Sequence, residues 1–486
     1  MFGGSPSRNM VNTVDKNITL DFDFKTNRNI KWTAKLGSRA YGGPTISSGK
    51  IFVGTNNESP RNQRDTLLRK DGKRDAIDKG IVMCFDEASG KFLWQHVNDK
   101  LPAGQVNDWE REGVCSTPAV EGNRLYYVSN RCELVCLDTG GLADGNQGVQ
   151  DEQYKDPTDA DVIWRLDMMK ELNVFPHNMA ACSPVVVGDL VYVITANGVD
   201  AGHINIPSPD APSFLAVDKN SGKVAWQSNL PGRNIMHGQW SNPTCAMVKG
   251  KAQMVFPGGD GWLYGLEPLT GKMIWKFDCN PKNSKYELGG RGTRSDFIAT
   301  PVEHDGLIYI GTGQDPEHYT GVGHLWCIDP SKATADNVDL SPVNDNFDPK
   351  APANAKSGLV WHYGGPEKNP QAAGRDFVFG RTMSTVSVHD GLLYAAELDG
   401  MVHCLDAKTG QVHWKHDIKE AIWGSTYYVD GKILLGTEVG NLFVFDAGKE
   451  KKEPKIIEGE QPIRSTPIVS GGVLYIMTES HLYAIK

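Results

Sequence analysis

The sequence lacks the features of several large classes of protein. No apolar stretch approaches the ~20 residues that a membrane-spanning helix needs. The printed start, MFGGSPSRNMVNTVDKN, lacks the charged beginning and apolar run of a secretory signal peptide. A basic excess is also missing, because 50 Lys and Arg face 59 Asp and Glu and leave a net charge of −9. We therefore expect no membrane span and no nucleic-acid partner.

The cysteines do not have the spacings that are typical of metal, haem or redox sites. The nine cysteines form no CxxC, no CxxCH haem site and no Cys/His spacing typical of zinc. The Gly-rich stretch GGRGTR (289–294) lacks the Lys-Ser/Thr ending of a phosphate-binding loop. We expect the cysteines to be small buried side chains.

What the sequence has in quantity is glycine, proline and a repeat. The 53 Gly and 27 Pro favour many turns over long helices. The segment FLAVDKNSGKVAW (214–226) recurs as MCFDEASGKFLW, WLYGLEPLTGKMIW and HCLDAKTGQVHW, with partial copies elsewhere. Its small position is occupied in turn by Cys84, Cys136, Ala216, Gly265, Cys327, Cys404, Val444 and Ala484. Spacings of 40 to 80 residues indicate a repeat of about 40 residues with loop insertions.

A second element repeats in phase with the first. Copies such as STPAVEGNRLYYVSN and ATPVEHDGLIYIGTG read as two β-strands joined by a Gly or Asp turn. Each unit therefore has four short antiparallel strands, A to D, which is the blade of a β-propeller. The last unit stops at its third strand, HLYAIK, while the early segment NIKWTAKL reads as a strand without a unit.

These observations predict an all-β fold, a single closed eight-bladed β-propeller with four-stranded antiparallel blades. We expect the N-terminal strand to complete the last blade, which leaves no open sheet edge. Residues 1–29 are then an N-terminal extension and residues 30–486 the propeller. The strand-D tryptophans are expected to pack between neighbouring blades; they are Trp32, Trp94, Trp164, Trp226, Trp275, Trp361 and Trp414.

The frame A-x-D-x-x-T-G-K-x-x-W resembles the tryptophan-docking motif of PQQ-type (quinoprotein alcohol dehydrogenase-like) eight-bladed propellers. GGDGWLYGLEPLTGKMIW is a near-ideal copy, and the resemblance covers residues 30 to 486. That superfamily includes quinoprotein dehydrogenases, outer-membrane-protein assembly lipoproteins and many proteins without a known ligand. The resemblance implies the fold more firmly than the function, and a periplasmic or other extracytoplasmic location.

Strand alternation sorts the insertions onto two faces. The B–C insertions (57–79, 198–213, 313–323) and the D–A insertions (97–114, 167–181, 229–241, 278–298, 364–382) share one face. The C–D insertions near 140–161 and 331–357 lie on the other. Long loops on a rigid scaffold are where binding residues collect, so we expect a funnel on the first face.

The D–A loops supply the candidate site residues near the axis. They are Arg39, Glu112, His177, Asn178, His237, Trp240, Arg294, Asp296, Arg381, Trp423 and Arg464. Guanidinium forks suit carboxylates and indole offers a stacking face, so a planar anion such as PQQ would fit. The alternative is that these side chains bond neighbouring blades and line a wet channel. His177 and His237 could form a metal pair, but the sequence shows no third ligand.

Two functions remain open at this point. One is a non-catalytic binding or assembly module that holds a protein partner or a small anionic ligand at the funnel. The alternative, implied by the resemblance, is a quinoprotein-type alcohol or sugar dehydrogenase with PQQ and Ca²⁺. Its calcium ligands would be a Glu, an Asn and an Asp, for which Glu112, Asn178 and Asp296 are the axial candidates. The vicinal cysteine pair of those enzymes is missing, since Cys115 stands alone, and no haem domain is attached.

Overall fold

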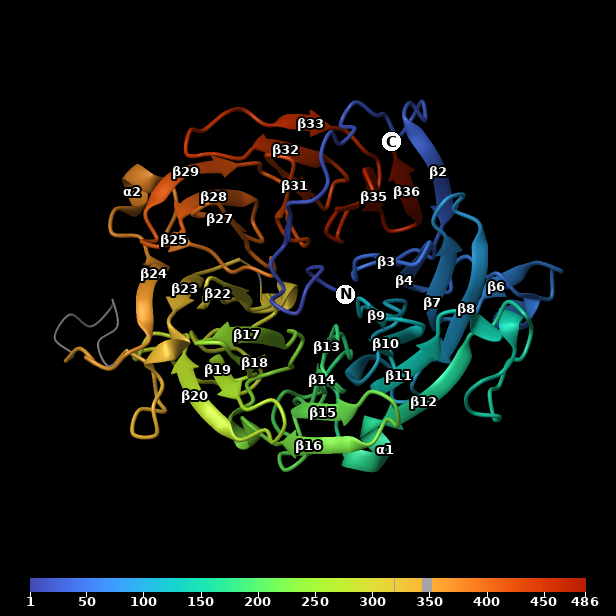
Figure 1. Ribbon diagram of the computed structural model, residues 1–486, viewed down its shortest axis with the longest axis horizontal. Helices are drawn as coiled ribbons and strands as arrows, with labels where there is room; N and C mark the ends of the chain where they lie inside the picture. The colour runs from blue at the N-terminus through green and yellow to red at the C-terminus, as the bar shows by residue number, and fades with distance from the viewer. Residues whose placement is uncertain (319, 343–351) are drawn as a thin grey trace.

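Eight four-stranded units stand around one axis and form a closed ring (Figure 1). The structure is a computed structural model that describes residues 1–318, 320–342 and 352–486. Within each blade the first strand, A, lies next to the axis and the fourth, D, on the outside. The predicted all-β eight-bladed propeller is confirmed.

The strands of the ring follow the chain in order. Blade 1 has β3 (Thr45–Ser47), β4 (Lys50–Asn56), β7 (Lys79–Asp86) and β8 (Phe92–Asp99); blade 2 has β9 (Ala119–Glu121), β10 (Arg124–Val128), β11 (Glu133–Asp138) and β12 (Asp161–Asp167); blade 3 has β13 (Val185–Val187), β14 (Leu190–Ile194), β15 (Phe214–Asp218) and β16 (Val224–Ser228); blade 4 has β17 (Thr244–Val248), β18 (Lys251–Pro257), β19 (Trp262–Leu266) and β20 (Met273–Asp278). Blade 5 has β21 (Val302–His304), β22 (Leu307–Gly311), β23 (His324–Ile328) and β24 (Leu359–Pro366), with β25 (Phe377–Phe379) added; blade 6 has β26 (Ser387–His389), β27 (Leu392–Ala396), β28 (Met401–Asp406) and β29 (Val412–Asp417); blade 7 has β30 (Tyr427–Val429), β31 (Lys432–Gly436), β32 (Leu442–Asp446) and β33 (Lys455–Ile457); blade 8 has β34 (Ile468–Ser470), β35 (Val473–Met477) and β36 (His481–Ile485).

Blade 8 takes its fourth strand from the other end of the chain. Strand β2 (Ile30–Lys35) pairs antiparallel with β36, and Trp32 lies opposite Ala484. This confirms the predicted closure by the N-terminal strand. Upstream of it, β1 (Val11–Asn12) adds to the inner edge of blade 7 in parallel with β30.

The small position of the repeat makes room for the tryptophan of the same blade. In seven blades the small residue on strand C pairs directly with the indole-bearing residue on strand D. The pairs are Cys84–Trp94, Cys136–Trp164, Ala216–Trp226, Gly265–Trp275, Cys327–Trp361, Cys404–Trp414 and Ala484–Trp32. A Cβ on Gly265 would lie 2.1 Å from Nε1 of Trp275, so a larger residue there would displace the ring. Blade 7 lacks the tryptophan and carries Val444 opposite Lys455.

Six of these indoles tie their blade to the next one. The Nε1 of Trp164, for example, donates to the carbonyl oxygen of Lys219 at 3.0 Å, in the C–D turn of blade 3. The ring also covers Gly222 of that turn, where φ is +71° and a Cβ would lie 2.7 Å from the indole. Glycine is required there by both the backbone and the contact. Trp275 is the exception, because its Nε1 donates to Oε1 of Gln253 within blade 4.

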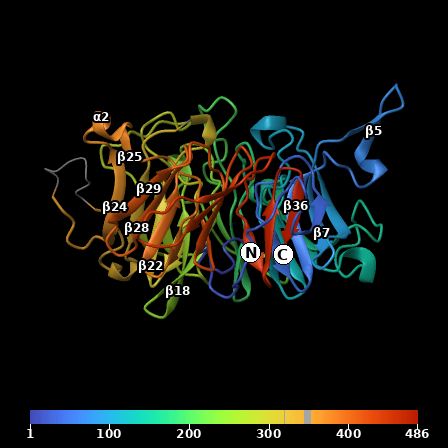
Figure 2. The ribbon, with the colours of Figure 1, turned by 90° about the horizontal axis from the view of Figure 1, so that it is seen from above.

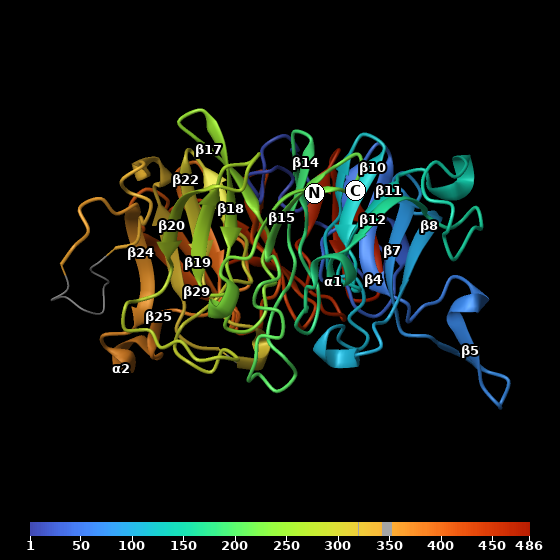
Figure 3. The same ribbon diagram turned by 90° about the horizontal axis from the view of Figure 1, so that it is seen from below.

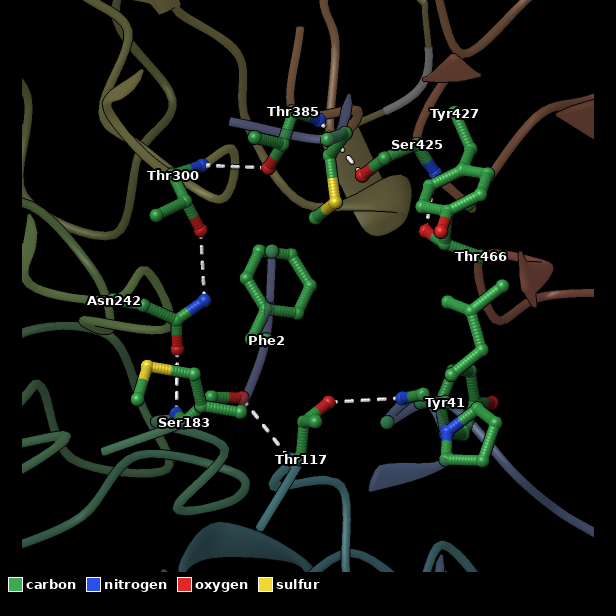
Figure 4. A pocket seen from close by; sticks show the side chains of 18 of the residues that line it. Phe2, Tyr41, Thr117, Ser183, Asn242, Thr300, Thr385, Ser425, Tyr427 and Thr466 are labelled. Carbon is green, nitrogen blue, oxygen red and sulfur yellow. Dashed lines mark hydrogen bonds between the residues drawn. The ribbon is translucent and has the colours of Figure 1, made fainter. Parts of the chain in front are cut away.

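A belt of hydrogen bonds joins the blades near the axis. In six blades the backbone N–H two residues before strand A donates to a side-chain oxygen of the following blade at 2.5–3.2 Å. The members are Gly43, Thr117, Ser183, Asn242, Thr300, Thr385, Ser425 and Thr466, with the link from Asn242 to Thr300 made between side chains (Figure 4). Gly43 has no side-chain oxygen to accept from blade 8. The belt explains the small polar residues that recur before the inner strands.

The two faces of the ring differ as the strand order requires. The hairpin of β5 (Thr66–Leu68) and β6 (Arg74–Ala76) and the short helix α2 (Pro370–Ala373) project on one side, which we call the loop face (Figures 2 and 3). The β17–β18 turn and the N-terminal segment lie on the opposite side, the turn face. The other α-helix, α1 (Met168–Leu172), follows β12. In the described parts of the chain, no helix is long and apolar enough to span a membrane. The predicted C–D insertion at 331–357 lies partly outside the described residues.

Candidate functional site

A cavity of about 810 Å³ lies on the propeller axis. Its turn-face end is filled by residues 1–5, and Phe2 sits inside the belt of small polar side chains (Figure 4). Arg8 anchors this segment: it is fully buried and donates to the carbonyl oxygens of Phe2, Ser183 and Pro243 at 2.8–3.0 Å. Burial lowers the pKa of Arg8 to about 10. A fully buried guanidinium therefore fixes the N-terminal segment at the turn-face end.

The loop-face end of the cavity is aromatic. It includes four half-buried rings, from Tyr41, Trp109, Trp240 and Trp423. The rings of Tyr41 and Trp423 lie 5.7 Å apart, and the guanidinium of Arg464 stands 5.5 Å from the first and 5.4 Å from the second. A cation over aromatic faces at this distance stabilises the arrangement. The three side chains form a preformed wall, which we call the aromatic wall.

The arginines beside this wall have carboxylate partners. Arg464 binds Glu438, with Nε to Oε2 at 2.8 Å, and also pairs with Glu479. Arg39 pairs with Glu479 as well, and its Nε lies 3.9 Å from Oε1 of Glu112. Two guanidinium charges thus face three carboxylates. An incoming anion would find no unbalanced positive charge at this side of the cavity.

Five of the eleven sequence candidates line the cavity, and six do not. Glu112, Asn178, Trp240, Trp423 and Arg464 line it; Arg39, His177, His237, Arg294, Asp296 and Arg381 lie outside its lining. Arg294 serves its own blade, because Nη2 binds Asp278 at 2.6 Å and Nε donates to the carbonyl of Asp260 at 2.7 Å.

Asp296 and Arg381 lie between blades 5 and 6. Asp296 is buried and forms a backbone bridge with Gly313, and Arg381 donates to the carbonyl oxygen of His318. Burial, followed by repulsion from Asp315, raises the pKa of Asp296 to about 8. Burial thus favours the neutral form of this carboxyl.

His177 and His237 belong to a cluster of imidazoles beside the cavity. His203, from the B–C insertion of blade 3, joins them, and the ring centroids of the three lie 4.5–4.9 Å apart. Nε2 of His203 lies 2.9 Å from Nε2 of His237. Nδ1 of His177 contacts the carbonyl oxygen of Val199 at 2.8 Å, while its buried Nε2 has no hydrogen-bond partner. Burial and the neighbouring His237 lower the pKa of His177 to about 3, so this ring is neutral at physiological pH.

A carboxylate supports the cluster from blade 5. Oδ2 of Asp315 lies 2.8 Å from Nδ1 of His237 and 3.1 Å from Nδ1 of His318, which is in the 3-10 turn Pro316–His318. Burial alone would raise the pKa of Asp315, but hydrogen bonds from His237 and His318 hold it below its usual range. The same contact raises the pKa of His318.

Sequence reasoning missed three members of this cluster. His203, Asp315 and His318 lie within insertions 198–213 and 313–323, which strand alternation predicts on the loop face. A third imidazole beside the histidine pair thus comes from a B–C loop, whereas the predicted candidates all come from D–A loops. The segments GHINIP and DPEH carry the signal, since each places a histidine in a loop bordering the axis.

Comparison with known proteins decides the family. A family model described as "Outer membrane protein assembly factor BamB" matches residues 78–147, 148–332 and 353–486. The chain belongs to this PQQ-repeat propeller family. Its matched segments span most of the ring, from blade 1 to blade 8, and the resemblance seen in the repeat is confirmed.

The relatives of this chain include both a dehydrogenase and an assembly factor. A polyvinylalcohol dehydrogenase from Sphingopyxis sp. is 22% identical over 69% of this chain and 50% of its own length. BamB from Nitrosomonas eutropha is 31% identical over 22% of this chain and 26% of its own length. The chain therefore spans half or less of these curated relatives. The crystal structure of BamB from Moraxella catarrhalis has a TM-score of 0.56 at 13% identity, covering 94% of this chain and 98% of that one, which shows the fold alone.

The residues present do not fit PQQ with Ca²⁺ as a set. Glu112 and Asn178 line the cavity, but Asp296 lies outside its lining. Cys115 is buried, with Sγ 3.8 Å from Sδ of Met179, and has no neighbouring cysteine in sequence. The three oxygen ligands that calcium would need are not gathered at one place.

Proposed function

We propose that this BamB-type propeller is a non-catalytic binding or assembly module, in an extracytoplasmic compartment, and that a protein partner docks at the loop face. The main support for this proposal is the aromatic wall of Tyr41, Trp423 and Arg464 at the mouth of the axial cavity. Aromatic rings and arginine dominate the energetics of protein interfaces, because they bury large areas at little cost in conformational entropy. The matching family is described as an assembly factor, which supports the same choice.

The cavity favours an apolar or aromatic side chain of the partner over a small anion. The arginines nearest the wall, Arg39 and Arg464, are balanced by Glu112, Glu438 and Glu479. A bound carboxylate or phosphate would compete with these partners and would also be repelled by them. An apolar side chain that packs against the exposed faces of Tyr41 and Trp423 meets no such cost.

Selection of random peptides on the immobilised protein tests the proposal. We expect the enriched peptides to carry aromatic or large apolar residues and to lose at least about tenfold in affinity on Trp423→Ala, which is about 1.4 kcal/mol. The matched control is Trp262→Ala, a half-buried tryptophan outside the cavity lining. Peptides that bind the Trp423→Ala protein as tightly as the wild type would contradict the proposal.

The dehydrogenase alternative rests on the relative named polyvinylalcohol dehydrogenase and on the presence of Glu112 and Asn178 in the cavity lining. Equilibrium dialysis with PQQ and Ca²⁺, followed by a dye-linked alcohol oxidation assay, separates the two functions. Stoichiometric uptake with turnover would establish the alternative and refute a purely binding role. We expect neither uptake nor turnover.

A further inference from the structure

We propose that His177, His203 and His237 form a binding site for one divalent transition-metal ion, such as Zn²⁺ or Co²⁺. One ring nitrogen from each lies within 4.8 Å of those of the other two. The ligands come from three loops of the loop face: the D–A loops before blades 3 and 4, and the B–C loop of blade 3 between them. The site is independent of what the aromatic wall binds.

The hydrogen-bonding state of His177 points to a ligand. Its Nδ1 lies 2.8 Å from the carbonyl oxygen of Val199, and a carbonyl only accepts, so this nitrogen carries the proton. Nε2 then has a free lone pair, yet this atom is buried without a partner, on a residue only 1% exposed. A buried unpaired nitrogen is costly, whereas a metal ion would satisfy it. Orientation of a ligating histidine by a carbonyl at the other nitrogen is the usual arrangement in metal sites.

A carboxylate lies beside the other ring nitrogen of His237. Its Nδ1 lies 2.8 Å from Oδ2 of Asp315, which leaves Nε2 directed at Nε2 of His203. This is the carboxylate–histidine–metal arrangement, in which the carboxylate fixes the ring and increases the basicity of the ligating nitrogen. In the metal-free state the 2.9 Å contact between the two Nε2 atoms is a hydrogen bond that uses one proton. A change of tautomer, in which the proton of His203 moves from Nε2 to Nδ1, frees both Nε2 atoms for a metal ion.

His203 is held at the cluster by an unusual backbone. Its φ is +56°, a conformation that is uncommon for residues other than Gly, although His, Asn and Asp adopt it more often than the rest. Asp200 fixes the loop, because Oδ1 accepts from the N–H of Ile204 at 3.0 Å and Oδ2 from Nδ2 of Asn205 at 2.8 Å. A strained conformation that aims an imidazole at two others is typical of functional sites.

His318 is a supporting group and not a fourth ligand. Both of its ring nitrogens are occupied, since Nδ1 contacts Asp315 at 3.1 Å and Nε2 contacts the carbonyl oxygen of Gly289 at 3.0 Å. It pairs with the same carboxylate that orients His237. The protein therefore offers three ligands, and a water molecule or a ligand group would take the fourth position.

The ligand type selects the metal. Three imidazoles suit zinc, cobalt, nickel or copper, whereas calcium and magnesium prefer oxygen. Zinc–nitrogen bonds of ~2.0–2.1 Å place tetrahedral ligand atoms ~3.3 Å apart. The observed 2.9 Å between His203 and His237 needs only a small opening to reach that separation.

A spectroscopic titration tests the site on the untagged full chain, because a polyhistidine tag would bind the same ions. The protein is freed of metal by chelation and titrated with Co²⁺, then with Zn²⁺ in competition. We expect one Co²⁺ per chain, with the intense visible bands of four-coordinate cobalt, and displacement by Zn²⁺. Thermal unfolding should shift upward with bound metal, since a ligand that binds only the folded state stabilises it.

Two variants separate a metal site from a merely structural cluster. His203→Asn keeps a residue that tolerates positive φ and removes one ligand, so we expect a loss of more than about 100-fold in affinity. Asp315→Asn removes the orienting carboxylate and should lose about 10–100-fold. The control is His304→Asn, a histidine in β21 outside the cluster, with wild-type binding expected. Circular dichroism verifies that each variant folds.

Two results would overturn the proposal. One is the absence of Co²⁺ and Zn²⁺ binding at micromolar concentration. The other is equal affinity of the wild type, His203→Asn and His304→Asn, which would show adventitious surface binding only. Neither result bears on peptide binding at Trp423.

Discussion

The two faces of the propeller differ in how the loops between the same strands are built. On the turn face the C–D turns repeat one arrangement, in which an indole donates to the next blade and covers a glycine, as Trp164 does with Lys219 and Gly222. On the loop face no two loops are alike, aromatic rings stay half-exposed, and the buried Nε2 of His177 has no partner. Contacts that repeat from blade to blade and leave no polar group unpaired stabilise the ring. Groups that do not repeat and lack a hydrogen-bond partner indicate where the protein binds other molecules. Substitutions on the two faces should therefore have opposite effects on stability and binding.

Trp226→Ala on the turn face should have the largest effect on stability. The side chain is buried, pairs with Ala216 across the blade and donates to the carbonyl of Pro268 at 2.7 Å. Truncation leaves a cavity between blades 3 and 4, and we expect the free energy of unfolding to fall by about 3–5 kcal/mol. Chemical denaturation measures it. A loss below about 1 kcal/mol would mean that the indole does not hold the two blades together.

Gly222→Ala tests the partner of the indole. The new Cβ would lie 2.7 Å from the ring of Trp164 at a φ of +71°, and we expect a loss of about 2–4 kcal/mol. Gly188→Ala is the matched control, because its φ is +60° and its Cβ would meet nothing within 4 Å. In that variant the free energy of unfolding should fall only by the cost of placing Ala at a positive φ, about 1 kcal/mol. Equal losses in the two variants would show that contact with the indole contributes nothing.

The repeated face is also the part that could be predicted from sequence. A small residue opposite the tryptophan, and a glycine under the indole, are local requirements shared by most blades, so the same letters recur, as at Ala216 and Trp226. Closure of the ring by β2, with Trp32 opposite Ala484, could be predicted because the last repeat unit has only three strands of its own. Each of these inferences depends on contacts that are identical in successive units.

The loop face could be predicted only in outline. Strand alternation assigned the insertions to one face, but contacts between loops depend on their individual paths. His203 reaches His237 because its loop turns at a positive φ, which no repeat specifies. Arg294, a candidate for the axis, is instead held by Asp278 within its own blade. Residues that meet from different insertions carry no shared pattern in the sequence.

Asp260, in the β18–β19 loop of the loop face, should make stability depend on pH. Burial raises the pKa of this carboxyl to about 6, although it accepts a hydrogen bond from the hydroxyl of Tyr264 at 2.7 Å. Between about pH 4 and pH 6 the unfolded chain binds fewer protons than the folded one, so the contribution is fully present below pH 4 and is lost as the pH rises. We expect Asp260→Asn to gain about 1–2 kcal/mol relative to the wild type across this window. Unfolding free energies measured for both proteins at pH 4, 5, 6 and 7 check this, and parallel curves would contradict it.

Trp423→Ala on the loop face should have the smallest effect on stability and the largest on binding. This indole is half-buried, and it contacts Tyr41 and Arg464 at the mouth of the cavity. Its removal exposes surface that already borders solvent and leaves no closed cavity, so we expect a loss of less than about 1 kcal/mol. Chemical denaturation beside Trp226→Ala gives the comparison directly, because both variants remove the same side chain. A loss near that of Trp226→Ala would show that Trp423 stabilises the fold, and the aromatic wall would then be scaffold instead of a binding surface.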